Sequence, residues 1–178
     1  KYIWEKCIEA GKEFNITPYG TETMHLLRAE KGFIIVGQDT DGTMTPVDLQ
    51  MDWIISKKKY DFIGKRSLYR SDTIREDRKQ LVGVVPLNKS QFIEEGQHIV
   101  ECENLPNKIK TPIKYLGHIS SSYHSPNLNH CISMAMIKGG NKLMGKKLFV
   151  STSKGNKNIP VEIVRPVFID PENKRLTS

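Results

Sequence analysis

A carboxylate at the end of a predicted helix is the residue of this sequence best suited to bind a ligand. Residues 21–30 favour a helix with Thr21 as its N-cap, and Gly32 is its expected stop, which places Glu30 in the last turn, followed by Lys31. The C-terminal end of a helix carries partial negative charge, so an anion there costs ~0.3–1 kcal/mol. Positions that break a local rule are candidates for function. From the residues alone, Glu30 is either a solvated glutamate or a carboxylate held in place for a ligand.

Two polar segments add candidate contacts for a charged ligand. Lys57–Lys59 is a run of three lysines, which is either a solvated strand end or a cationic rim for a carboxylate or phosphate tail. Residues 120–126 (SSSYHSP) are predicted as a polar loop between two strands. Such loops on a rigid scaffold often line binding sites, although a hydrogen-bonded turn is the simpler interpretation. Neither segment identifies a reaction.

Metal chemistry finds little support in the sequence. Three histidines recur at six-residue spacing: His118, His124 and His130. No cysteine pair or HExxH motif accompanies them, so ordinary strand and turn histidines are the better interpretation. Asp39, Asp41 and Gly42 resemble a calcium loop, but Gln50 stands where the bidentate glutamate is required. We therefore predict no metal site, and we assign no catalytic residue.

Charge and cysteine content narrow the class of protein. The chain of 178 residues has a formal net charge of +7, which favours an anionic partner such as nucleic acid, a membrane surface or a small polyanion. A nucleic-acid-binding barrel is one alternative, but the predicted strands lack aromatic residues at alternate positions. No apolar run approaches membrane-spanning length and no signal peptide is visible. We expect a cytoplasmic protein with reduced, buried or half-buried cysteines: Cys7, Cys102 and Cys131.

Helices are predicted in the first part of the chain. In residues 1–14 a spacing of three and four indicates an amphipathic helix with one apolar face: Trp4, Cys7, Ile8 and Gly11. In the helix over 21–30, the expected buried stripe consists of Met24 and Leu27, with Leu26 as a further candidate. A short helix is predicted after Gly64.

Strands are predicted on both sides of a polar linker over residues 71–79. Before the linker, apolar runs favour strands over 33–37 and 53–56. After it come six short β-rich runs separated by turn residues: 81–86, 98–102, 115–119, 132–137, 147–152 and 161–164. Short strands at this spacing predict a small antiparallel barrel or sandwich.

The order of motifs resembles the aminomethyltransferase (glycine cleavage T-protein) superfamily. The resemblance rests on residues 27–46 (LRAEKGFIIVGQDTDGTMTP), 52–68 (DWIISKKKYDFIGKRSL) and 78–87 (RKQLVGVVPL). Residues 117–140 (GHISSSYHSPNLNHCISMAMIKGG), with Met144 and Gly145 after them, are more closely similar to the C-terminal region of the α subunit of heterotetrameric sarcosine oxidase, a branch of that superfamily. The resemblance extends over residues 1 to about 169.

This resemblance implies an α+β fold in two units. Residues 1–76 would be the C-terminal part of an aminomethyltransferase-like folate-binding domain, and residues 77–178 a C-terminal antiparallel β-barrel domain. The chain would be a piece of a longer polypeptide, since Lys1 already stands inside a predicted helix.

The resemblance also implies a role for two residues. In the superfamily, the glutamate of an L-R-x-E-x-G motif holds the pterin ring of folate, and here that glutamate is Glu30. A pterin presents an amino group and a ring N–H side by side, and one carboxylate accepts both; such charge-assisted hydrogen bonds contribute ~1.5–3 kcal/mol each. Lys59 stands where T-proteins carry an arginine in the folate site. Lysine keeps the charge but not the planar fork, so this is the weaker contact. The catalytic aspartate of the superfamily belongs to a half that this chain lacks.

The implied function is the capture of a one-carbon unit. The chain would be the tetrahydrofolate-binding portion of a sarcosine oxidase α subunit, an oxidoreductase acting on CH–NH, with 5,10-methylenetetrahydrofolate as product; by itself it would be inactive. FMN, FAD and NAD would lie elsewhere in the complex. The partners would be the N-terminal remainder of the α subunit and the β, γ and δ subunits, without nucleic acid or membrane.

Two other readings stay open. The chain is also consistent with another T-protein relative: a glycine cleavage aminomethyltransferase, a dimethylglycine or sarcosine dehydrogenase, or a folate-dependent demethylase. The second is a structural fragment that packs on partner subunits and binds no ligand.

Overall fold

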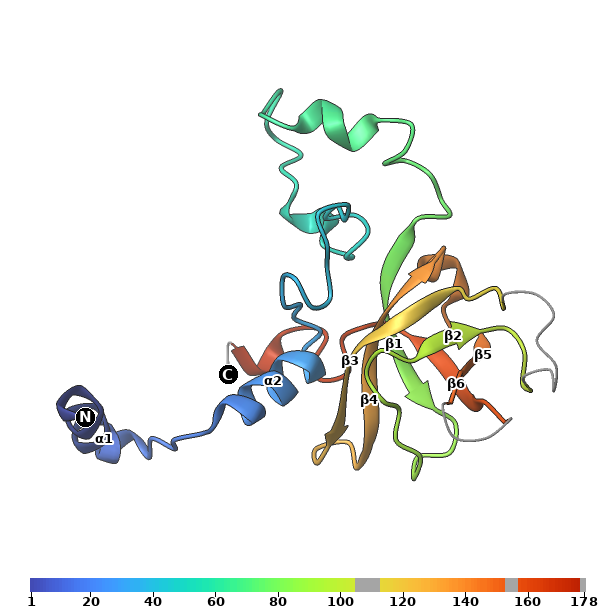
Figure 1. The fold of residues 1–178 in the computed structure, drawn as a ribbon. Helices are drawn as coiled ribbons and strands as arrows, with labels where there is room; N and C mark the ends of the chain where they lie inside the picture. Colours follow the sequence, from blue (N-terminus) through green and yellow to red (C-terminus); the bar gives the residue numbers. More distant parts are fainter. Residues whose placement is uncertain (105–112, 153–156, 177–178) are drawn as a thin grey trace.

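The structure is a computed structural model that describes three stretches of the chain: residues 1–104, 113–152 and 157–176 (Figure 1). Two α-helices and a 3-10 helix form its first part: α1 (Tyr2–Gly11), η1 (Lys12–Phe14) and α2 (Thr21–Glu30). Helix α1 stands away from the barrel at the end of an extended link, whereas α2 packs against it (Figure 1). The predicted helices over 1–14 and 21–30 are confirmed, although Gly20 rather than Thr21 occupies the N-cap position of α2.

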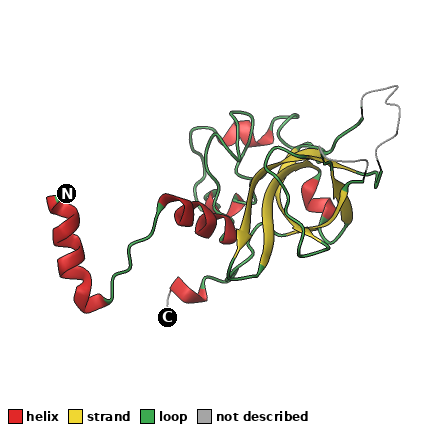
Figure 2. Cartoon of the chain, turned by 60° about the horizontal axis from the view of Figure 1, so that its bottom comes forward, coloured by secondary structure: helices red, strands yellow, loops and turns green. Residues whose placement is uncertain are grey.

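The buried side of α2 differs from the prediction. Met24 and Leu27, predicted as the buried stripe, are 46% and 44% exposed, and the buried residues of this helix are Ala29 and Glu30. Burial is confined to the last turn because only that end of α2 reaches the barrel wall, at the right of the helix in Figure 2. The apolar face of α1 is covered at its C-terminal end, where Gly11 is buried against Ile16, but Trp4 is 60% exposed.

The segment between α2 and the barrel lacks the two strands predicted for it. The run over 33–37 makes only one isolated bridge, and the run over 53–56 begins inside a 3-10 helix, η2 (Asp52–Ile54). A strand needs a neighbour to pair with its backbone groups, and no described strand lies beside either run. The helix predicted after Gly64 is confirmed as the 3-10 helix η3 (Lys65–Tyr69).

The second part of the described chain forms a closed six-stranded antiparallel barrel. Its strands are β1 (Lys79–Pro86), β2 (His98–Val100), β3 (Gly117–Ser125), β4 (His130–Lys138), β5 (Lys147–Val150) and β6 (Ile159–Val164). The order around the barrel is β1-β4-β3-β2-β5-β6, and β6 pairs with β1 to close it. Two 3-10 helices accompany them: η4 (Gly140–Leu143) and η5 (Lys174–Leu176). The predicted fold class is confirmed, and closure leaves no edge strand exposed.

Strand β3 is longer than predicted. Residues 120–125, predicted as part of a polar loop, continue β3 and pair with β4 as far as Ser125 opposite His130. The prediction failed because serine is typical of turns, whereas here the hydroxyls find partners within the fold. Ser122 Oγ, for example, donates to the Ile93 carbonyl at 2.6 Å. The true connection to β4 is the turn over residues 126–129.

Strand β4 is buried on both faces, which explains its nearly continuous apolar sequence. One set of its side chains joins the core inside the barrel: Cys131, Ala135 and Ile137. The alternate set lies in a second core against the end of α2: Ile132, Met134 and Met136. Ala29 of α2 belongs to this second core, so the barrel wall itself fixes the end of the helix.

The cysteine prediction holds for one residue of three. All three cysteines are free, but Cys7 and Cys102 are exposed and Cys131 is buried. Cys7 is exposed although the last residue of its helix, Gly11, is buried against Ile16, because that contact does not extend as far as Cys7. Among the residues that the structure describes, no helix is long and apolar enough to cross a membrane.

A buried ion pair fastens the irregular segment to the start of β1. Asp48 is 2% exposed, and Arg78 Nη2 approaches its carboxylate to 2.8 Å. Thr45 adds a backbone and a hydroxyl donor, each at 2.9 Å. Burial by itself raises the pKa of Asp48, but the hydrogen bonds from Arg78 and Thr45 outweigh it and hold the pKa below its ordinary value.

We expect this pair to make the fold sensitive to acid. Because the folded pKa of Asp48 is lowered, its contribution is fully present above the unfolded value of about 3.9 and is lost as pH falls through and below it. Urea denaturation between pH 6 and 3 should show a smaller loss of unfolding free energy with pH in Asp48→Asn than in the wild type. Asp77→Asn, at a side chain 72% exposed, should keep the wild-type slope. Equal slopes for wild type and Asp48→Asn would contradict the prediction.

Candidate functional site

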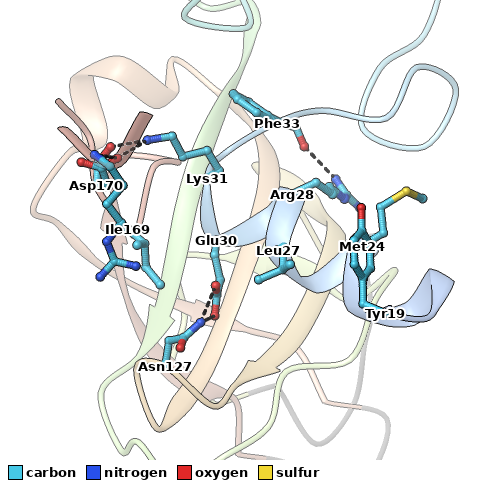
Figure 3. A pocket seen from close by; sticks show the side chains of 11 residues that line it. Tyr19, Met24, Leu27, Arg28, Glu30, Lys31, Phe33, Asn127, Ile169 and Asp170 are labelled. Carbon is cyan, nitrogen blue, oxygen red and sulfur yellow. Dashed lines mark hydrogen bonds and ion pairs between the residues drawn. The ribbon is translucent and has the colours of Figure 1, made fainter. Parts of the chain in front are cut away.

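A cleft of about 430 Å³ lies beside the end of α2 (Figure 3). Its walls come from the link before α2, α2 itself, the β3–β4 turn and the segment after β6. Apolar side chains form much of the surface: Tyr19, Met24, Leu27, Phe33 and Ile169. Met24 and Leu27 therefore face this cleft instead of the core, which accounts for their exposure.

The carboxylate of Glu30 lies at the base of this cleft and is held by the β3–β4 hairpin. Ser125 Oγ donates to Oε1 at 2.5 Å. Asn127 Nδ2 lies 3.1 Å from Oε1 and 2.9 Å from Oε2 (Figure 3). Although Glu30 is only 3% exposed, it lines the cleft. These donors offset the free-energy cost of burying an anion at a helix C-terminus.

The backbone at the end of α2 is fixed as firmly as the side chain. The N–H groups of Phe33 and Gly32 donate to the carbonyls of Arg28 and Ala29 at 2.8 and 3.0 Å, which is a Schellman motif with Gly32 at φ +73°. The Glu30 carbonyl accepts two further N–H groups at 2.9 Å, from residues 168 and 169. The predicted stop at Gly32 is confirmed, and the C-terminal segment docks on it.

Lys31 and Asp170 close one side of the cleft. Lys31 Nζ donates to the Asp170 carbonyl and lies 3.1 Å from its carboxylate. Burial by itself raises the pKa of Asp170. Hydrogen bonds from Lys31 and from the backbone N–H groups of Lys174 and Arg175 outweigh this effect, so the pKa lies below its ordinary value. The positive charge of Lys31 is thus committed to an ion pair beside Glu30.

Arg28 fastens the other side of α2 to the barrel. Its Nη1 lies 2.5 Å from Asp39 Oδ2 and its Nη2 donates to Ser121 Oγ at 2.7 Å. Asp39 also accepts hydrogen bonds from the hydroxyls of Ser120 and Ser121 and from the Ile35 N–H. Asp39, considered for calcium, is therefore a buried structural carboxylate that links Arg28 of α2 to the serines of β3.

The structure places the other predicted ligand contact elsewhere. Lys59 is exposed and lines a separate cleft of about 400 Å³ with Pro46, Phe62 and Leu68. The described chain therefore does not bring Lys59 into the cleft of Glu30, and its contact with folate stays a prediction. Among the described residues, no group of three histidine, cysteine, aspartate or glutamate side chains is arranged to hold a metal ion.

Sequence reasoning missed Asn127 and gave Ser125 no specific role. Ser125 falls in the polar segment considered as a site lining, but Asn127 lies just beyond it. The available signal was the Ser125-Pro126-Asn127 sequence, which is typical of a turn. No local pattern relates this turn to a helix about a hundred residues earlier.

The arrangement suits a flat ligand that donates hydrogen bonds. A carboxylate accepts and does not donate, and the surrounding aromatic and aliphatic side chains offer a surface for a ring. A planar heterocycle with adjacent N–H groups would match both features. The acceptor oxygens of Glu30 and the apolar side chains around them suit the binding and orientation of such a ligand.

Two family models and several known proteins match this chain. The family model "GCVT N-terminal domain" matches residues 1–59, and "Glycine cleavage T-protein C-terminal barrel domain" matches residues 79–170. The chain is 48% identical over 173 residues to sarcosine oxidase subunit alpha of Corynebacterium sp. (strain U-96), covering 97% of this chain and 17% of the relative. The corresponding protein of Rhizobium meliloti (strain 1021) is 36% identical, with 98% and 17% covered.

More distant relatives agree. An aminomethyltransferase of Clostridium botulinum (strain Okra / Type B1) is 28% identical, with 86% of this chain and 39% of the relative covered. The crystal structure of glycine cleavage system aminomethyltransferase T from Bartonella henselae has a similar fold, with a TM-score of 0.64 and 22% identity over 82% of this chain and 37% of that one. This chain thus spans only 17% of the length of the sarcosine oxidase relatives. Because the barrel family matches more than half of the residues, this chain belongs to the glycine cleavage T-protein family and carries its C-terminal barrel domain.

Proposed function

We propose that this chain is the tetrahydrofolate-binding portion of a sarcosine oxidase α subunit, where the one-carbon unit from sarcosine is captured as 5,10-methylenetetrahydrofolate. The observation that carries the proposal is the Glu30 carboxylate, held at the base of an apolar cleft by Ser125 and Asn127. The relatives named sarcosine oxidase subunit alpha, at 48% and 36% identity, support the choice of this branch.

The cleft fits the pterin ring of folate in chemistry. Pterin presents an amino group and a ring N–H on one edge, and the two oxygens of Glu30 accept such a pair. Each hydrogen bond to the charged carboxylate contributes ~1.5–3 kcal/mol. Tetrahydrofolate, when bound, supplies the nitrogen atoms that take up the one-carbon unit. The residues of this chain bind and orient it, and Tyr19 and Phe33 offer aromatic surface to the ring.

The proposal assigns this chain a place in a larger assembly. Residues 1–76 would complete a folate-binding domain together with a preceding part of the same polypeptide, and residues 77–178 would brace it as a barrel domain. FMN, FAD and NAD, and the β, γ and δ subunits, would belong to the rest of the complex. This chain covers 17% of the length of the sarcosine oxidase relative, so that subunit is much longer than this chain.

The proposal predicts that Glu30→Gln weakens folate binding. The amide keeps the shape of the side chain but loses the charge and one acceptor, so we expect a loss of about 1.5 kcal/mol or more, roughly tenfold in Kd. The measurement is calorimetric titration of 5-formyltetrahydrofolate into the full-length polypeptide that carries this sequence.

A matched substitution separates this effect from a general change of charge. Glu162 is an exposed glutamate of β6, and Glu162→Gln should bind like the wild type. Equal affinity of Glu30→Gln and wild type would remove Glu30 from the site, and a wild type that binds no folate analogue would sink the proposed function.

A further inference from the structure

The side-chain amide of Asn127 is oriented by hydrogen bonds to Glu30. This residue lies on the β3–β4 turn, and its Nδ2 is within hydrogen-bond distance of both carboxylate oxygens, at 3.1 and 2.9 Å (Figure 3). A carboxylate oxygen only accepts, so the NH2 end of the Asn127 amide must face Glu30. The carbonyl end, Oδ1, therefore points away from the carboxylate.

That carbonyl oxygen is available to a ligand. Asn127 is exposed and lines the cleft, and no donor among the described residues bonds to its Oδ1. Glu30 and Asn127 both line the cleft and are bonded to each other, so the cleft contains acceptor oxygens of both residues.

The turn that carries Asn127 is preorganised. Ser125 Oγ accepts a hydrogen bond from the Leu128 N–H at 3.1 Å while it donates to Glu30. The Asn129 N–H donates to the Ser125 carbonyl at 2.8 Å, with Asn129 at φ +56°. Because these bonds are in place, Asn127 requires no rearrangement of the turn to meet a ligand.

We propose that Asn127 is a second recognition residue of this cleft, which accepts a hydrogen bond through Oδ1 from the amino group of a 2-aminopterin ring. The inference rests on the proposed function. An amino group has two hydrogens in one plane; when the first is donated to Glu30, the second points sideways, toward an acceptor next to that carboxylate. Asn127 thus has two roles: its NH2 end orients Glu30 and its oxygen reads the ligand.

The test separates these two roles with a double-mutant cycle. The binding of 5-formyltetrahydrofolate to the full-length polypeptide is measured for Asn127→Ala, Glu30→Ala and the double variant, by ligand-observed NMR, which still reports weak binding. In the wild-type background we expect Asn127→Ala to raise Kd about tenfold. In the Glu30→Ala background, where no carboxylate is left to orient, it should still raise Kd about threefold or more.

Each outcome is decisive. No remaining effect of Asn127→Ala in the Glu30→Ala background would show that Asn127 makes no contact of its own and would overturn the inference. Asn141→Ala, at an exposed asparagine of η4 whose side chain has no bonded partner among the described residues, should bind like the wild type. A wild type that fails to bind would instead contradict the proposed function, so the two failures are distinguishable.

Discussion

Replacing Arg28 by methionine should remove about 3–5 kcal/mol of folding stability, the largest effect expected of any substitution considered for this chain. Methionine keeps the length and apolar stem of the side chain but leaves Asp39, whose side chain is fully buried, without its positive partner. Ser120, Ser121 and the Ile35 N–H still donate to that carboxylate, but a buried charge without a counter-charge is costly. Urea denaturation of the full-length polypeptide, followed by circular dichroism, gives the difference.

The chain offers a matched control and a rescue. Arg75 also pairs with aspartates, but its side chain is 54% exposed, so Arg75→Met should cost less than about 1 kcal/mol. The double variant Arg28→Met with Asp39→Asn removes the stranded charge and should recover part of the loss. A change within 1 kcal/mol of wild type for Arg28→Met alone would mean that the ion pair does not hold α2 to the barrel.

Substituting alanine for Gly32 should cost about 2–4 kcal/mol of stability and also weaken folate binding. Gly32 lies at φ +73°, a backbone conformation that costs an L residue roughly 1–2 kcal/mol. A Cβ there would stand 2.6 Å from the carbonyl oxygen of Pro166, and such overpacking typically costs ~1–3 kcal/mol. Relief requires α2 and the C-terminal segment to move apart, which loosens the two N–H bonds to the Glu30 carbonyl.

Gly42 is the matched control, because its φ is not positive and a Cβ at this position would have no atom within 4 Å. Gly42→Ala should therefore stay within about 1 kcal/mol of wild type, in either direction. Thermal unfolding and folate titration of both variants separate the two consequences of Gly32→Ala. A stable Gly32→Ala protein with unchanged affinity would show that the end of α2 tolerates displacement.

Arg28 and Gly32 flank Glu30 within one turn, and their substitutions act on the same carboxylate from different sides. Arg28 ties the helix to the barrel through Asp39, while Gly32 lets the C-terminal segment reach the Glu30 backbone. The motif L-R-x-E-x-G therefore has a structural meaning for two of its positions besides the proposed ligand contact. Each of these residues contributes to holding the carboxylate at the base of the cleft.

Much of the fold was predictable because it depends on neighbours in sequence. The turn residues and the short β-rich runs after the linker predicted the six strands. Gly32 predicted the helix stop, since glycine accepts a positive φ without strain. Glu30 stood out because an anion at a helix C-terminus is locally unfavourable.

The tertiary structure alone decided which segments meet. The runs over 33–37 and 53–56 have the composition of strands but no strand beside them, whereas the serine-rich residues 120–125 became a strand because β4 pairs with them. Hydrogen-bonded pairing outweighs local propensity in both cases. The same holds at the cleft, where Ser125 and Asn127 reach Glu30 across more than ninety residues of chain. The sequence by itself identified a carboxylate out of place; the packing of α2 against the β3–β4 hairpin supplied the donors that keep it there, because a contact between distant segments depends on tertiary packing and not on any local pattern.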